Sequence, residues 1–336
     1  MDLDTFLTQL YVIVDDWYKA EMARDMARRT GPSAKLSDSE VLTIGLAGQW
    51  RVGVPWRSER GVVRYMQKHG RGWFPHMLQR SQFNERVRAL WAVFVRLQQA
   101  VAGWLYRDEL FEVVDCTELP HCSLSQAASH DRHWLSGGLG RGGNNGGWFY
   151  GEQVLMSTSS AGVITGWLVG QAQIDDRWMM EAFLSTRHSH MRMIGPEPAK
   201  SKKYNITHVA TPESFGPALT TGVAVGLPYL ADEGFNGDRW RVHWLQEYTA
   251  DVITAPPKNA ATAWTSADKK WLSKHRQIVE TVFARLTTVF SLKRLNAHSD
   301  WGKITRLAAI TAAYNLGILL NRILRREDGA LETLIT

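Results

Sequence analysis

One short stretch, FEVVDCTELP at residues 111–120, constrains the fold more than any other part of the chain. Its apolar, β-prone start is typical of an inner strand that is covered on both faces. Because side chains alternate along a strand, Asp115 and Thr117 share one face and Cys116 points to the other. A carboxylate at this place is costly unless positive charge pairs with it. Asp115 is therefore either a surface or capping residue at the strand end, or a metal ligand at the edge of a sheet.

The residues that follow alternate between strand and turn signals. A glycine-rich loop, residues 137–147, lacks the Gly-Lys-Ser/Thr ending of a phosphate-binding loop, so we expect no nucleotide site there. The pair Asn145-Gly146 is a turn signal, and strands are predicted at 148–158 and 163–172. Short turns between three consecutive strands predict an antiparallel meander.

A second apolar strand, predicted at 223–231, also ends in a carboxylate, since Asp232-Glu233-Gly234-Phe235 follows it. In open α/β sheets, ligands bind at the carboxyl ends of the strands, so Asp232 is a second candidate ligand. A short further strand is predicted at 251–254. Residues 187–226, rich in Gly, Pro and Lys, are predicted to form an insertion or a long loop.

Three helices are predicted around these strands. Asp175 and Asp176 are predicted to cap the first of them. The second is a long helix that carries Glu280 opposite its apolar stripe, with Arg276 one turn before it. The alternative for these two residues is a surface pair at i, i+4, worth a few tenths of a kcal/mol. The third, at about 303–325, is apolar over most of its surface and should be buried.

Residues 1 to about 105 are predicted to be all-helical. Ser37 with Glu40 forms a capping box ahead of an apolar run, and apolar residues recur at helical spacing over 87–101. Basic residues three and four apart form one helix face between these segments: Arg57, Arg60, Arg64 and Lys68. This stripe is either a solvated charged face or a set of phosphate contacts in a helical DNA-binding domain. Only Glu59 interrupts it, which favours phosphate contacts.

Charge and composition exclude several protein classes. The 39 Lys and Arg exceed the 33 Asp and Glu by six, which permits an anionic partner. Two cysteines argue against a disulfide scaffold, and the amino terminus lacks the pattern of a signal peptide. The apolar run 307–320 is shorter than the ~20 residues of a membrane span, so we expect no membrane segment.

A zinc site is a competing interpretation of the region around Asp115. Potential ligands cluster there: Cys116, His121, Cys122, His130 and His133. Zinc prefers four such ligands. Their spacing matches no usual Cys-x-x-Cys pairing, which makes structural zinc the weaker alternative.

The three carboxylates Asp115, Asp232 and Glu280 are separated by 117 and 48 residues. The order of meander, helix, strand, strand and helix resembles a ribonuclease H-like fold, and the whole chain resembles the DDE transposases of bacterial insertion sequences. The resemblance covers nearly the full length. It is carried by the segments Leu36-Ser37-Asp38-Ser39-Glu40-Val41, Phe74-Pro75 to Phe83-Asn84, Trp148-Phe149-Tyr150-Gly151, Asp232-Glu233-Gly234-Phe235 and Arg276-Gln277-Ile278-Val279-Glu280-Thr281-Val282-Phe283.

The resemblance implies an α/β fold with a mixed sheet flanked by helices, preceded by an all-α DNA-binding domain. The expected domains are residues 1–107 and 108–328. It also implies that the three acids bind two Mg²⁺ (or Mn²⁺) ions, which oxygen ligands suit. One ion would activate water or a 3′-hydroxyl and the other would stabilise the leaving oxygen, the two lying roughly 4 Å apart.

The implied activity is cleavage of double-stranded DNA at inverted-repeat ends and joining of the 3′ ends to target DNA. A homodimer or larger assembly in the bacterial nucleoid is expected, with no membrane partner. The expected DNA contacts are Arg57, Arg60, Arg64, Lys68, Arg141 and Arg276. Two alternatives remain, a nuclease without strand transfer and a non-catalytic DNA-binding protein derived from a transposase. Ser273 and Thr287 replace a Tyr and a Lys found in one subset of such transposases, so no DNA-hairpin step is implied.

Overall fold

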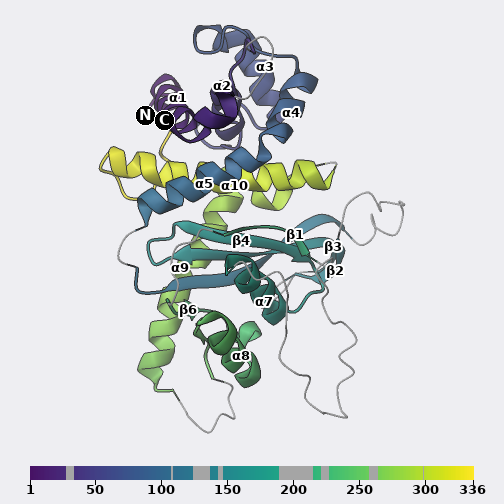
Figure 1. Ribbon diagram of the computed structural model, residues 1–336, viewed down its shortest axis with the longest axis vertical. Coiled ribbons are helices and arrows are strands. Elements are labelled where there is room, and N and C mark those ends of the chain that lie inside the picture. Colours follow the sequence, from purple (N-terminus) through teal and green to yellow (C-terminus); the bar gives the residue numbers. More distant parts are fainter. Residues whose placement is uncertain are drawn as a thin grey trace. The chain divides into compact units, whose positions relative to one another are not determined.

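The structure is a computed structural model, and the chain forms two compact units (Figure 1). It describes residues 1–27, 34–106, 109–123, 137–142, 147–188, 215–220, 227–256, 264–297 and 299–336. The helical unit comprises Met1–Trp104 and Arg285–Thr336, and the α/β unit comprises Leu105–Ala284. One long helix, α9 (Ser266–Phe290), contributes residues to both units.

The helical unit contains α-helices and short 3-10 turns. Its elements are α1 (Leu3–Ala27), α2 (Asp38–Ala47), α3 (Glu59–His69), η1 (Gly70–Gly72), α4 (Arg80–Ala89), α5 (Trp91–Leu105), η4 (Leu292–Arg294) and α10 (Asp300–Ile323). The predicted capping box is present at the start of α2, where Ser37 and Glu40 each accept the other's backbone N–H. The single helix predicted over 87–101 is interrupted at Leu90, between α4 and α5. Within the part of the chain that the structure describes, no helix is long and apolar enough to cross a membrane.

The core of the helical unit joins residues from the two ends of the sequence. The Trp50 ring packs edge-on against Phe290, with 4.8 Å between ring centroids, and against Phe6 at 5.0 Å. The Arg51 N–H donates to the Val289 carbonyl at 2.8 Å. Helix α10 is buried along most of its length, as its apolar sequence predicts. Residues 285–336 therefore belong to the same compact unit as residues 1–104.

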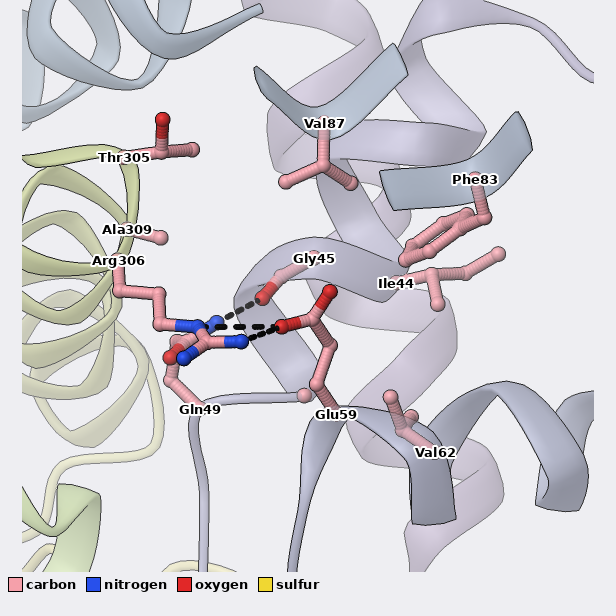
Figure 2. A pocket seen from close by; sticks show the side chains of 11 residues that line it. Ile44, Gly45, Gln49, Glu59, Val62, Phe83, Val87, Thr305, Arg306 and Ala309 are labelled. Atoms are coloured by element: carbon pink, nitrogen blue, oxygen red, sulfur yellow. Dashed lines mark hydrogen bonds and ion pairs between the residues drawn. The ribbon is translucent and has the colours of Figure 1, made fainter. Parts of the chain in front are cut away.

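An ion pair within the helical unit connects α10 to the start of α3 (Figure 2). The Arg306 guanidinium donates to the Glu59 carboxylate and also to the Leu295 carbonyl. Beside it, the Gln49 side chain donates to the Gly45 carbonyl at 2.8 Å. Apolar side chains of α2, α3 and α4 line the rest of the small pocket that these groups share. Glu59, which interrupts the basic stripe in the sequence, thus forms an ion pair with Arg306.

The α/β unit is built on a mixed sheet. Its strands are β1 (Glu112–Ser123), β2 (Gly138–Arg141), β3 (Trp148–Ser159), β4 (Ile164–Gln171), β5 (Phe215–Thr220), β6 (Tyr229–Leu230) and β7 (Val252–Ile253). The strand order is β5-β4-β3-β1-β6-β7, with β2 paired to β3. Strands β1, β3 and β4 form the predicted antiparallel meander, and β6 and β7 run parallel to β1. The predicted mixed α/β sheet is confirmed.

Three segments differ from the sequence expectations. The glycine-rich stretch predicted as a loop contains β2, because its backbone pairs with β3 despite the low strand propensity of glycine. The strand predicted at 223–231 is shorter, since β6 covers only Tyr229–Leu230 and residues 221–226 lie outside the described residues. Most of the predicted insertion at 187–226 also lies outside them. Its described part includes β5, which pairs with β4.

Helices cover both faces of the sheet. This is expected because β1 is apolar and its side chains alternate between the two faces. Helices α7 (Asp176–Arg187) and α8 (Asp238–Tyr248) share a core with Val114, whereas α9 shares a core with the neighbouring Val113. Figure 1 shows α7 in front of the sheet. Asp115 therefore faces the α9 side and Cys116 faces the α7 side, which is the arrangement expected from the sequence.

A buried ion pair fastens the end of α7 to the start of β1. The Arg187 guanidinium donates to Glu112 at 2.6 Å and to the Tyr229 hydroxyl at 2.7 Å, and Ser157 also donates to Glu112. The two charged side chains are only 4% and 0% exposed. Burial lowers the pKa of Arg187, but Glu112 and Tyr229 more than offset this and hold the pKa above its usual value.

Candidate metal centre

The register of two parallel strands brings Asp115 and Asp232 to the same level of the sheet. Strands β1 and β6 pair through Glu112 with Tyr229 and through Val113 with Leu230. Asp115 is the second residue after Val113, and Asp232 is the second residue after Leu230. The sheet thus delivers one carboxylate from each of two adjacent strands. Asp232 follows the carboxyl end of β6, as expected, whereas Asp115 lies within β1 and not at a strand end, because β1 continues to Ser123.

Local hydrogen bonds orient both carboxylates. Asp115 Oδ1 accepts the N–H of Cys116 at 2.8 Å. Asp232 precedes the short turn η3 (Glu233–Phe235), and its Oδ1 accepts the N–H of Gly234. These bonds use the first oxygen of each group, which leaves Oδ2 of each to face Arg276 of α9.

Arg276 lies between the two aspartates rather than beside Glu280. Its Nη2 is 3.8 Å from Asp115 Oδ2 and 3.7 Å from Asp232 Oδ2, close enough for ion pairing but too long for hydrogen bonds. Its Nε is buried without a hydrogen-bond partner among the described residues. Arg276 therefore offsets part of the negative charge of the two aspartates without saturating the carboxylate oxygens.

Asp176 is a further acid at this site, and the sequence analysis assigned it only a capping role. Asp175 is the N-cap of α7, since its carboxylate accepts the N–H of Arg177 at 3.0 Å. Asp176 instead lies so close to Gly234 that a Cβ on this glycine would collide with both Asp176 Oδ2 and Asp232 Oδ1. The two consecutive aspartates, Asp175 and Asp176, could have indicated this second role, because the start of a helix needs only one N-cap residue.

Burial and mutual repulsion perturb the charges of these acids. Burial raises the pKa of Asp115 to about 7, where Arg276 opposes the rise and Asp232 adds to it. Burial raises the pKa of Asp176 to about 6, a hydrogen bond with Cys116 opposes it, and Asp232 adds to it. The pKa of Cys116 is raised by its own burial and then by Asp176. The site thus brings acidic groups together where partial burial limits screening by solvent, and a cation would relieve that cost.

The donor set fits a hard divalent cation. Carboxylate oxygens, which Asp115 and Asp232 present together, are the ligands that Mg²⁺ and Mn²⁺ prefer. Glu280, by contrast, is exposed on α9, one turn after Arg276. In the described ranges, no three Asp, Glu, His or Cys side chains are close enough together to enclose a metal ion. The structure therefore brings Asp115 and Asp232 together and leaves Glu280 outside their immediate contacts.

The other candidate ligands and DNA contacts lie elsewhere. Cys116, His121 and Cys122 do not form a metal-binding group within the described residues, and His130 and His133 lie outside them. The basic stripe is exposed: Arg57 precedes α3, and Arg60, Arg64 and Lys68 lie on it. Arg141 is exposed at the end of β2.

Comparison with models of protein families, with curated proteins and with solved structures found no match in any of the three. The geometry of Asp115, Asp232 and Arg276 is therefore the main indication of what this chain does.

Proposed function

We propose that this chain is a divalent-metal-dependent DNA transposase of the DDE type. The observation that carries the proposal is the pair of Asp115 and Asp232, placed level by adjacent parallel strands and facing Arg276. Two partly buried carboxylates so placed are costly in the apo protein, and a divalent cation with bound phosphate oxygens would compensate for them. Ribonuclease H-like phosphoryl transfer needs this kind of site.

The connectivity of the α/β unit supports the same proposal. The chain runs through the meander β1, β3 and β4, with β2 between β1 and β3, and then through α7. After β5 come the parallel strands β6 and β7, which α8 separates, and then α9. This is the order that the resemblance to ribonuclease H-like transposases implies. The first 104 residues contribute only helices among their described elements, which agrees with a helical DNA-binding domain.

The acids have distinct places in the proposed site. Asp115 and Asp232 would hold a Mg²⁺ or Mn²⁺ ion between their strands, with Asp176 beside them. Glu280 is proposed as the third acid, since it lies one helical turn, a rise of ~6 Å, beyond a residue whose guanidinium contacts both aspartates. When bound, two such ions would supply an activated hydroxyl nucleophile and stabilise the leaving oxygen. Arg276 would orient the scissile phosphate against the acids.

DNA affinity is assigned to the exposed basic stripe of the helical unit, with Arg141 and Arg276 contacting DNA from the α/β unit. The proposed partners are inverted-repeat ends and target DNA. A homodimer or larger assembly would bring two inverted-repeat DNA ends together, and it would act in the bacterial nucleoid. These assignments follow from the proposed activity.

The basic stripe should set much of the salt dependence of DNA binding. Each neutralised phosphate contributes about 0.9 to the slope of log affinity against log salt concentration. Replacing Arg57, Arg60, Arg64 and Lys68 together by Ala should therefore flatten the slope by up to ~3.6. Fluorescence anisotropy over a salt series measures it. An unchanged slope would remove this surface from the DNA interface.

Replacing Arg276 by Ala should tighten divalent-cation binding while weakening DNA cleavage. Arg276 repels a cation at the aspartate pair, and removing ~1.4 kcal/mol of repulsion, near the water limit for close charges, gives about tenfold tighter Mn²⁺ binding. Isothermal titration with Mn²⁺ and a cleavage assay measure the two effects, with Arg276→Lys as the charge-preserving control. If Mn²⁺ binding weakened in Arg276→Ala, the arginine would be supporting the site structurally instead.

The proposed activity itself is tested with the DNA that flanks the coding region. A plasmid carrying those flanks is incubated with the protein and Mg²⁺, and the products are sequenced. Joined 3′ ends are the expected result. Hydrolysed ends without joining would identify a nuclease, and tight binding without cleavage in either Mg²⁺ or Mn²⁺ would identify a non-catalytic DNA-binding protein.

A further inference from the structure

The β2–β3 hairpin displays exposed apolar and basic side chains on one face. Arg141 is the register partner of Trp148, and Leu139 is the register partner of Tyr150. Directly opposed residues share a face of the sheet, so these four side chains lie together. Trp148 is 58% exposed and Leu139 is 52% exposed, and Arg141 is also exposed. We call Leu139, Arg141, Trp148 and Tyr150 the hairpin face.

The hairpin face lies on the same side of the sheet as Asp115. Asp115 is the register partner of Met156, and Trp148 is an even number of residues before Met156 on the regular strand β3. The eight-residue separation corresponds to ~26 Å along the strand. The opposite side of the hairpin is packed, since Phe149 is buried and a Cβ on Gly140 would meet Phe149 and Ala172. Among the described residues of the two strands, the uncovered aromatic ring, Trp148, therefore lies on the side that carries Asp115.

Gly147 precedes Trp148 and has no side chain that could cover the Trp148 ring. Gly147 has open space where a Cβ would be, and the hairpin is closed there by the hydrogen bond from Gly142 N–H to the Gly147 carbonyl at 3.1 Å. An accessible indole beside a guanidinium is the combination that binds single-stranded nucleic acid, by base stacking and phosphate contact.

We propose that the hairpin face binds an unpaired DNA strand, with Trp148 stacking on a base and Arg141 contacting a backbone phosphate. This inference rests on the proposed function of the acidic site. The bases of an intact duplex are covered by their neighbours, so an indole can stack flat on one only where the strand is unpaired. The ~26 Å to Asp115 corresponds to roughly eight nucleotide steps of a stacked strand.

A protein partner is disfavoured by the size and charge of the surface. Stable protein interfaces bury about 800 Å² on each partner, and two exposed apolar side chains beside an arginine supply far less apolar area. The charge of Arg141 complements a phosphate backbone.

The test compares two DNA probes in EDTA, so that cleavage does not interfere. One is a blunt duplex of about 20 bp, and the other is the same duplex with a single-stranded tail of about ten nucleotides that contains 2-aminopurine. Trp148→Ala should weaken binding of the tailed probe by about fivefold to a hundredfold, the usual effect of losing one base–aromatic stack. It should also restore 2-aminopurine fluorescence, and blunt-duplex affinity should not change.

Matched variants separate stacking from a loss of structure. Trp148→Phe keeps an aromatic ring and should bind the tailed probe within about threefold of the parent. Trp104→Ala removes a tryptophan that is 48% exposed on α5 and should bind both probes like the parent. Arg141→Gln should weaken tailed binding and reduce its salt slope by about 0.7, the value for one single-strand phosphate contact.

Unchanged tailed binding in Trp148→Ala, with blunt binding intact, would refute the inference and leave the proposed function standing. A change of oligomeric state in Trp148→Ala, measured by sedimentation, would refute it in favour of self-association. Failure of the parent protein to bind either probe would refute the proposed function and this inference with it.

Discussion

Replacing Asp115 or Asp232 by Asn should lower Mg²⁺-dependent cleavage of terminal DNA by roughly a thousandfold or more. Metal stabilisation of phosphoryl transfer is worth several kcal/mol, and each ~1.4 kcal/mol is a factor of ten in rate. Asn keeps the size of the side chain but removes the charge that holds the cation. DNA binding without metal should survive, because it depends on basic residues elsewhere. One cleavage assay with Mg²⁺ and one binding assay in EDTA measure the two quantities.

The neighbouring acids supply the controls for this experiment. Glu233 is exposed and adjacent to Asp232, and Glu233→Gln should cleave like the parent protein. Glu280→Gln should behave like the aspartate variants if it is the third acid. A Glu280→Gln protein that cuts within about threefold of the parent would exclude that role. Asp176→Asn would then test the acid whose carboxylate, like that of Asp232, lies beside Gly234. Full activity in both Asp115→Asn and Asp232→Asn would end the case for the site.

Replacing Arg187 by Met should lower the free energy of unfolding by about 3–5 kcal/mol. The methionine leaves the Glu112 carboxyl group without its cationic partner at a position where its side chain is fully buried, with the Ser157 hydroxyl still donating to it. Denaturation by urea, followed by circular dichroism, measures the loss. Removing both charges with Glu112→Gln and Arg187→Met should be less damaging than the two single changes added together, because no isolated charge remains.

An exposed ion pair at the start of α7 provides the control for this prediction. Arg177 pairs with Asp175 at 2.7 Å, but both side chains are well exposed, at 37% and 43%. Arg177→Met should therefore cost less than about 1 kcal/mol. Equal losses in Arg177→Met and Arg187→Met would show that burial of the Glu112 pair contributes nothing to stability.

Short-range sequence patterns predicted where strands and helices lie, but not which residues of other elements they contact. Apolar runs and alternation located β1 and its carboxylate, and turn signals located β3 and β4, because these features depend on residues a few positions apart. The i, i+4 spacing of Arg276 and Glu280 predicted a possible surface pair. The structure instead pairs Arg276 with two aspartates from other elements, a contact that only the register of β1 and β6 creates.

Two further features could not be predicted from local patterns. Asp176 has the sequence context of a cap, and its placement near Gly234 depends on how α7 packs against the turn after β6. The all-round apolar character of α10 predicts its burial but not its partners, so the sequence alone places residues 285–328 in the α/β domain. The contacts of Trp50 with Phe290 place them with the first helices instead.

The discontinuous helical unit has a consequence for synthesis. Its two parts are separated by about 180 residues, 105 to 284, which a ribosome needs on the order of 10–35 s to translate. During that interval the first helices are made, but the partners of Trp50 and Glu59, Phe290 and Arg306, do not yet exist. The nascent chain must carry an unfinished apolar surface while the α/β unit is completed. Chaperone depletion should therefore harm this protein during translation more than after its release.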